Sequence, residues 1–168
     1  DLKFKDLRML SQIVSMLALA ATMWTTIGAL GRRVVLERLT LTAALTAVVI
    51  WLEPVQQTLR LGQINLVLLA VVVCDLLRPD TARTKGLGVG IAAGIKLTPA
   101  IFIVYLFLTR RTRAGVVAVA TVHATIAGGF VVLPSDSWHF WAERTFADAD
   151  RIGAVAYVGN QSVHGFIA

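Results

Sequence analysis

The sequence is poor in charged residues, in cysteine and in long polar segments, and each shortage excludes a class of protein. Only 15% of its 168 residues are charged, whereas a soluble domain usually has about a quarter, so the chain cannot cover a soluble domain with polar surface. Its single cysteine, Cys74, lies within an apolar run, which excludes a disulfide framework. The histidines His123, His139 and His164 lack the spacing of metal ligands, so we predict no metal site.

What the chain has instead is apolar sequence. Apolar residues make up 57% of it, and the mean hydropathy is +0.73. This composition predicts an all-α, polytopic membrane helical bundle, with residues 1–168 forming a single transmembrane region. A full span needs about 20 residues, so some of the helices are expected to be short or re-entrant. The predicted helical segments are 9–30, 39–52, 64–77, 86–108 and 114–133, followed by an outer loop at 134–168.

The basic residues are arranged in short clusters between these apolar segments. The net charge of +6 invites a nucleic-acid interpretation, but a nucleic-acid surface needs a continuous basic stripe, and none is present. Short clusters at the ends of apolar segments are typical of membrane topology and of contact with anionic lipid. We therefore expect a multi-pass protein of the plasma membrane that contacts membrane lipids and does not bind nucleic acid.

The stretch Glu53–Leu66 is unusually polar for a connection between two apolar segments. We expect a loop at the tip of a helical hairpin, where Pro54 ends the first helix and Gly62 allows the chain to turn. A simple turn needs none of the amide and guanidinium groups found here, which favours a binding role over a solvated loop. The candidate substrate-binding side chains in this stretch are Gln57, Arg60, Gln63 and Asn65.

Lys96 is the second candidate, because it lies in the middle of the apolar segment 86–108. A lysine within the membrane costs at least about 2.5–3.5 kcal/mol on insertion scales, which makes it a candidate functional residue. The alternative is a structural lysine that reaches the interface or pairs with a carboxylate such as Asp75. If Lys96 and Arg60 share one cavity face, the two cations suit a lipid-linked phosphate.

The segment 86–108 has two interpretations. As one straight span it would place the basic clusters around Lys85 and Arg111 on opposite sides of the membrane, against the positive-inside tendency. As a hairpin, residues 86–95 rise, the chain breaks at 96–99 and residues 100–108 return, so both clusters face the cytoplasm. The count of basic residues on each side favours the hairpin.

The glycines of this segment match a nucleotide-binding motif in spacing only. Residues 88–93 fit G-x-G-x-x-A, but no βαβ unit surrounds them, so we predict no nucleotide cofactor and no other cofactor. Gly86, Gly90 and Gly94 recur every four residues, which predicts a small-residue face for close helix packing. His123, in the following segment, is interpreted as a hydrogen-bond partner between helices.

Three blocks carry a resemblance to a known family: Pro54–Leu66, Gly90–Pro99, and Arg151–Gly153 together with Gly159–Ser162. They resemble, in this order, the signatures of glycosyltransferase family 87, and the similarity runs from about Met9 to the C-terminus. The family consists of polyprenyl-phosphate-mannose-dependent α-1,2-mannosyltransferases with the GT-C membrane fold. The resemblance implies an enzyme that moves mannose from polyprenyl-phosphate mannose to a lipid-linked glycan acceptor, as in phosphatidylinositol mannoside or lipoglycan synthesis.

The resemblance also implies an inverting reaction, in which a carboxylate deprotonates an acceptor hydroxyl and polyprenyl phosphate leaves. The family's general base, an aspartate, is expected upstream of this chain, which we interpret as an internal part of a longer protein. Neither Asp1 nor Asp6 is assigned to that role, so no catalytic residue is predicted within 1–168. Arg60 or Lys96 would face the departing phosphate. The side chains expected to orient the sugars are Gln63, Asn65, Asn160 and Gln161, with Gln57 and His164 as further candidates.

Two other classes of protein remain open at this point. A transporter or flippase segment for a lipid-linked or anionic substrate would also have a broken helix, a buried lysine and a polar cavity, but internal inverted repeats are not apparent. A membrane scaffold would use the same polar groups only to join helices, and it would tolerate conservative amide substitutions in 53–65.

Overall fold

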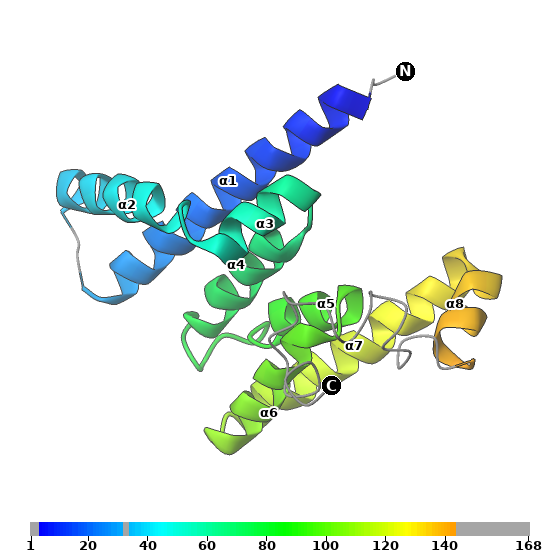
Figure 1. Cartoon of the computed structure of the whole chain (residues 1–168). Helices are drawn as coiled ribbons and strands as arrows, with labels where there is room; N and C mark the ends of the chain where they lie inside the picture. Colours follow the sequence, from blue (N-terminus) through cyan, green and yellow to red (C-terminus); the bar gives the residue numbers. More distant parts are fainter. Residues whose placement is uncertain (1–3, 32–33, 144–168) are drawn as a thin grey trace, which may run out of the picture. The chain divides into compact units, whose positions relative to one another are not determined.

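The computed structural model describes residues 4–31 and 34–143. Within this part of the chain the regular structure is entirely helical, as expected for part of a helical membrane bundle (Figure 1). In chain order the helices are α1 (Phe4–Ala29), α2 (Val35–Val49), α3 (Glu53–Leu61), α4 (Asn65–Leu76), α5 (Leu87–Ile95), the 3₁₀ helix η1 (Thr98–Ala100), α6 (Ile101–Leu108), α7 (Thr112–Val132) and α8 (Pro134–Trp141).

The chain divides into two compact units, residues 1–125 and 126–168. Helix α7 begins in the first unit and ends in the second. The described part of the second unit also holds α8, where the rings of Phe140 and Trp141 meet edge to face with their centroids 5.0 Å apart. The candidate site and the basic loops belong to the first unit.

Two of the described helices are long and apolar enough to cross a membrane, namely the 6–29 part of α1 and the whole of α7. Helices α2 and α3 pass the same test only as a pair, and they are bent by 80° relative to each other. Many large apolar side chains are exposed on these helices. In water such exposed apolar surface would be a liability, whereas lipid is a suitable solvent for it.

The stretch Glu53–Leu61 is a helix, α3, so the prediction of a loop here is wrong. Pro54 occupies the first turn of α3, where its missing N–H costs nothing and its fixed φ favours the helical conformation. Gly62 ends the helix with φ 62°, in the left-handed region, which glycine adopts without a steric penalty. The turn predicted at Gly62 is therefore confirmed, and it leads directly into α4.

Helix α4 contributes to both hydrophobic cores of the first unit. At its start, Leu66 packs with Leu19 of α1 and Val55 of α3, and α4 packs along α1 (Figure 1). Further along, α4 packs against α5, and it shares a second core with α6 and α7. The buried residues of this second core are Leu68, Val72, Val89, Ala92, Leu106, Ala114 and Ala118.

The glycines of α5 allow it to approach α7 closely, which confirms the predicted small-residue face. A Cβ atom built on Gly90 would lie 2.5 Å from the Thr121 Cβ and 2.6 Å from the Ala118 carbonyl oxygen. The equivalent atom on Gly94 would lie 2.7 Å from the Thr125 Cβ. Because these distances are shorter than any real Cβ contact, the backbones of α5 and α7 can meet only where side chains are absent.

Helix α5 begins against a buried carboxylate. Asp75, at 4% exposure, accepts hydrogen bonds through Oδ2 from the backbone N–H groups of Gly86 at 2.9 Å and Val89 at 3.0 Å. These N–H groups lie at a helix start, where backbone donors lack intrahelical partners. Asp75 therefore fixes the start of α5, and the alternative in which it pairs with Lys96 is wrong.

The loop before α5 contacts the start of α7, which follows α6. The Arg113 Nη2 donates to the carbonyl oxygens of Asp80 at 2.7 Å and Ala82 at 2.9 Å. A straight helix over 86–108 would separate its ends by about 34 Å, so these contacts require the segment to return. The helical structure breaks between Ile95 and Thr98, where the hairpin interpretation places the break.

Within the described part of the chain, His123 bonds to its own helix and not to a second one, contrary to the prediction. Its Nδ1 lies 2.8 Å from the carbonyl oxygen of Val119, one turn earlier in α7.

Candidate functional site

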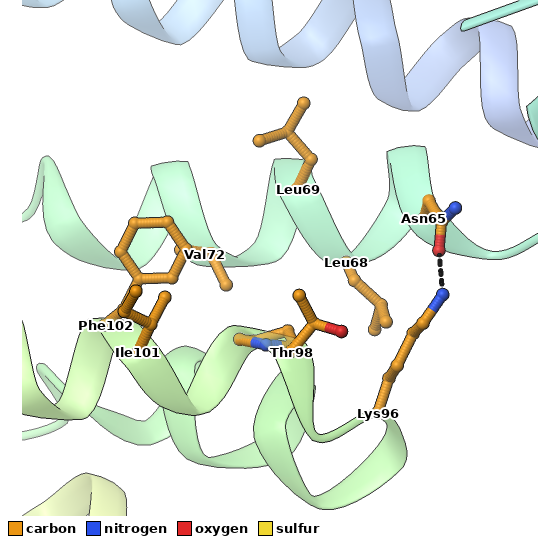
Figure 2. A pocket seen from close by; sticks show the side chains of 9 residues that line it. Asn65, Leu68, Leu69, Val72, Lys96, Thr98, Ile101 and Phe102 are labelled. Atoms are coloured by element: carbon orange, nitrogen blue, oxygen red, sulfur yellow. Dashed lines mark hydrogen bonds between the residues drawn. The ribbon is translucent and has the colours of Figure 1, made fainter. Parts of the chain in front are cut away.

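The candidate site forms where the break after α5 meets the start of α4. Lys96 follows the last residue of α5 in an extended conformation. The helix cannot continue normally because Pro99 lacks an N–H and its ring would clash with the carbonyl group of Ile95. The Lys96 Nζ leaves the break and donates to the Asn65 Oδ1 at 2.7 Å (Figure 2).

Asn65 uses both ends of its amide. While its Oδ1 accepts from Lys96, its Nδ2 donates to the Gln63 Oε1 at 2.7 Å and lies 3.4 Å from the Thr58 Oγ1. Three predicted site residues, Gln63, Asn65 and Lys96, therefore join in one hydrogen-bonded group. We call this group the Asn65 network. Thr58, which is 5% exposed, is the fourth member of this network. It was not among the predicted site residues.

A cavity of about 430 Å³ opens beside this network. Asn65, Lys96 and Thr98 provide its polar groups, and the rest of its wall is apolar (Figure 2). A cation at the edge of an apolar groove suits an amphipathic molecule with an anionic head and a hydrocarbon tail. The apolar lining residues are Leu68, Leu69, Val72, Pro99, Ile101 and Phe102.

A second cavity, of about 340 Å³, lies on the other side of Asn65. Gln57, Thr58 and Gln63 line it, and Asn65 and Leu69 line both cavities. The structure thus brings Gln57, Gln63, Asn65 and Lys96 into one region, with amide groups on one side and the cation and apolar wall on the other.

Arg60 lies elsewhere. It lines a cavity of about 310 Å³ together with Arg8, Ser11 and Gly62, and it does not line the Lys96 cavity. The prediction that Arg60 and Lys96 share one cavity face is therefore wrong. Thr58 and Arg60 are two residues apart on α3, about 200° around the helix axis, so Thr58 faces Asn65 while Arg60 faces α1.

Arg8 lines the same cavity as Arg60, and the sequence pattern did not predict this. It is an isolated basic residue just before an apolar segment, a position that usually reports only where a membrane helix begins. No motif joins it to Arg60, because the two are brought together only when α3 packs against α1.

Three of the predicted site residues, Asn160, Gln161 and His164, lie outside the described residues. Among those described, no group of three or more His, Cys, Asp or Glu side chains is arranged to hold a metal ion. The geometry available for chemistry in 4–31 and 34–143 is therefore that of a cation and several amides beside an apolar cavity.

A cation and several amides thus lie at the edge of an apolar cavity within part of a helical membrane bundle. The family is shown by sequence comparison: residues 2–168 match the model of glycosyltransferase family 87, and the chain belongs to this family. No solved structure matches the chain. Family membership favours the glycosyltransferase interpretation over a transporter or flippase.

The chain is similar to mycobacterial enzymes with stated donors. It is 39% identical over 134 residues to the polyprenol-phosphate-mannose-dependent alpha-(1-2)-phosphatidylinositol mannoside mannosyltransferase of Mycobacterium tuberculosis, covering 79% of this chain and 31% of the relative. The enzyme of the same name from Mycolicibacterium smegmatis is 37% identical, with 79% and 30% covered. A phosphatidylinositol pentamannoside mannosyltransferase of M. smegmatis is 39% identical over 125 residues, with 73% and 30% covered. The chain spans about a third of the length of these relatives.

Proposed function

We propose that this chain forms part of a GT-C-type mannosyltransferase, a multi-pass enzyme of the plasma membrane. The enzyme transfers mannose from polyprenyl-phosphate mannose to a lipid or glycolipid acceptor of the phosphatidylinositol mannoside type. Family membership and the stated donors of the relatives support the reaction. One structural observation carries the proposal, namely that Lys96, bonded to Asn65 at 2.7 Å, lies at the edge of an apolar cavity.

The donor suits this cavity chemically. A polyprenyl phosphate combines a flexible hydrocarbon chain with an anionic head, and the cavity combines an apolar wall with one ammonium group. We assign the first isoprenoid units to the wall formed by Leu68, Ile101 and Phe102, and the phosphate to Lys96. When the glycosidic bond breaks, negative charge accumulates on the departing phosphate, and a fixed cation beside it lowers the barrier.

In this proposal the amide side chains bind the sugar. The side chains of Gln63 and Asn65 are bonded to each other, with the Asn65 Nδ2 donating to the Gln63 Oε1 at 2.7 Å. Gln57 lines the adjoining cavity. Amide groups of this kind can bond sugar hydroxyls without adding charge. Asn160, Gln161 and His164 are proposed to add further contacts to the donor or acceptor sugar, on the strength of the sequence resemblance. The general base is proposed to be an aspartate outside this chain.

The variant Lys96→Met tests the phosphate role, because it removes the charge at similar volume. The measurement is mannosyl transfer from polyprenyl-phosphate mannose by the purified enzyme. Charge-assisted hydrogen bonds contribute about 1.5–3 kcal/mol, so we expect transfer to fall by roughly ten- to a hundredfold. Transfer at the wild-type rate by a monodisperse Lys96→Met protein would contradict the proposal.

Arg83→Gln is the matched control, since Arg83 is an exposed cation in the loop at the opposite end of α4. It removes the same charge without touching the Lys96 cavity and should leave transfer unchanged. Arg60→Lys provides a second comparison. Because Arg60 lines a different cavity, this variant should leave the Michaelis constant for the donor unchanged even if it slows transfer. A donor Michaelis constant raised equally by Arg60→Lys and Lys96→Met would place both cations at the phosphate.

A further inference from the structure

A second concentration of charge lies at the opposite end of α4 from the Asn65 network. Helix α4 has 12 residues, so its two ends are about 18 Å apart. The loop that follows α4 contacts the loop between α6 and α7, and together they enclose a cavity of about 420 Å³. Its lining residues are Asp80, Lys85, Thr109, Arg110, Arg111, Thr112, Arg113 and Ala114. We call this the loop cavity.

The loop cavity is built around one carboxylate that is outnumbered by cations. The Asp80 Oδ1 accepts from the Lys85 Nζ at 2.6 Å and pairs with the Arg111 Nε at 3.2 Å. The same Lys85 Nζ donates to the carbonyl oxygen of Arg78 at 2.6 Å, and the lysine is only 3% exposed. Arg113 donates hydrogen bonds to the carbonyl oxygens of Asp80 and Ala82. Asp80 can neutralise only one of these positive charges.

Among the described residues that line the loop cavity, Arg110 is a cation with no carboxylate partner. It lines the loop cavity, and within 4–31 and 34–143 its guanidinium group forms no ion pair with a carboxylate. Its backbone has φ 59°, a conformation that residues other than glycine adopt rarely. The surrounding loop contacts thus hold Arg110 in place at some energetic cost.

Exposed leucines come directly before each of the two loops in the sequence. Leu108, which ends α6, is 78% exposed, and Leu77, which follows α4, is 45% exposed. An anionic headgroup bound between the loops would therefore have apolar surface beside it for its acyl chains. Inorganic phosphate would bind to the cations but would gain nothing from these leucines.

We propose that the loop cavity is a binding site for the phosphate group of an anionic phospholipid, separate from the donor site at Lys96. Arginine forks and a lysine ammonium group match phosphate oxygens, and basic pockets between membrane helices bind anionic headgroups in this way. Occupancy joins the two loops across Asp80 and so stabilises the returning α5–α6 segment, which carries Lys96 at its break.

The test measures lipid binding to the purified protein in detergent, by native mass spectrometry and by the shift in thermal unfolding midpoint. Phosphatidylglycerol, phosphatidylcholine and inorganic phosphate are compared at matched concentrations. We expect phosphatidylglycerol to bind and raise the midpoint. Arg110→Gln should weaken its binding about tenfold, because one charge-assisted hydrogen bond contributes a factor of that order. Arg83→Gln removes the same charge from the other loop, the one after α4, at a position that does not line the cavity, so it should bind like wild type.

Several results would overturn the proposal. Equal weakening by Arg83→Gln and Arg110→Gln would mean diffuse attraction to a basic surface. Equal stabilisation by phosphatidylcholine would remove the role of charge, and equal stabilisation by inorganic phosphate would remove the role of the lipid. If Arg110→Gln does not fold, Arg110→Lys replaces it: this variant keeps the charge but loses the fork, and it should bind phosphatidylglycerol more weakly than wild type. Wild-type affinity in Arg110→Lys would then contradict a bidentate phosphate site.

Discussion

Among single residues, Asn65 has the most informative position, because one amide contacts Lys96, Gln63 and Thr58. Asn65→Leu keeps the branched shape of the side chain but leaves Lys96 without its acceptor, so we expect mannosyl transfer to fall by roughly ten- to a hundredfold. Asn65→Asp keeps an acceptor for Lys96 but adds a negative charge beside the proposed phosphate position. Because the carboxylate competes with the phosphate for Lys96, the Michaelis constant for the donor should rise more than kcat falls.

Steady-state kinetics with polyprenyl-phosphate mannose separate these two effects. Gln12→Leu is the control: Gln12 is a half-buried amide on α1 whose Nε2 reaches the Leu59 carbonyl oxygen at 3.5 Å, away from the Lys96 cavity. It should leave the donor Michaelis constant unchanged. A wild-type donor Michaelis constant in Asn65→Asp would mean that no anion binds next to Lys96.

Asp80 provides a residue-scale prediction about pH. The hydrogen bond from Lys85, aided by the charges of Lys85, Arg111 and Arg113, outweighs the opposing effect of desolvation and lowers the pKa of Asp80 below its ordinary value of about 4. A carboxyl group whose pKa is lower in the folded state stabilises the fold above its unfolded-state pKa. It loses that contribution as the pH falls through its folded-state pKa.

Asp80→Asn should therefore melt at a lower temperature than wild type near pH 7, and the difference should shrink as the pH falls below about 4. The thermal unfolding midpoint measured from pH 7 down to pH 3 checks this. A difference that stays constant over the whole range would show that the carboxylate charge of Asp80 is not involved.

Among the elements, the contact between α5 and α7 gives the clearest prediction about stability. Gly90→Ala would place a Cβ atom 2.6 Å from the Ala118 carbonyl oxygen, which belongs to helical backbone and cannot move aside alone. Overpacking of this kind typically costs about 1–3 kcal/mol, so the thermal unfolding midpoint in detergent should fall by several degrees.

Gly128→Ala is the matched control, since an added Cβ at Gly128 meets nothing within 4 Å. Alanine favours a helix by up to about 1 kcal/mol over glycine, so this variant should be neutral or slightly more stable. An unchanged midpoint in Gly90→Ala would mean that α5 and α7 do not pack through the glycine face.

The elements also show which parts of the fold were predictable. The glycine face was predictable because glycines four residues apart fall on one side of any helix. The break after α5 was predictable because a proline and a central lysine both disfavour a continuous apolar span. Helix α3 was not, because Pro54 can end one helix or begin the next. The choice depends on whether Val55 and Thr58 are buried by α1 and α4, and local sequence does not contain that information.

In the candidate site, too, the residue types were predictable from local sequence, whereas their contacts depend on how the helices pack. Gln63 and Asn65 were selected because amides are costly in an apolar chain, and Lys96 because a membrane cation is costlier still. That Lys96 bonds Asn65, 31 residues earlier, depends on the packing of α4 against α5. The separation of Arg60 from Lys96 depends on α3 being helical, so the error about the loop produced the error about the shared cavity.

For the molecule as a whole, the contacts of the basic segments constrain how the described helices are placed across the membrane. The loop after α4 contacts the loop between α6 and α7 through the Asp80–Arg111 pair, and it contacts the start of α7 through Arg113. A bilayer core about 30 Å thick cannot lie between groups in hydrogen-bond contact. The polar stretch at α3 lies at the other end of α4, so it is expected on the opposite side of the membrane or within a cavity open to that side.

Thr84 and Thr112 should therefore be on the same side of the membrane, the cytoplasmic side. The experiment uses Thr84→Cys and Thr112→Cys in a Cys74→Ala background, because native Cys74 is exposed, and labels intact cells with a membrane-impermeant maleimide. We expect neither variant to react until the cells are permeabilised. Glu53→Cys, at the exposed start of α3, is the control and should react in intact cells. If one of the two threonine variants labels from outside and the other does not, then a membrane separates the two loops and the returning α5–α6 segment is wrong.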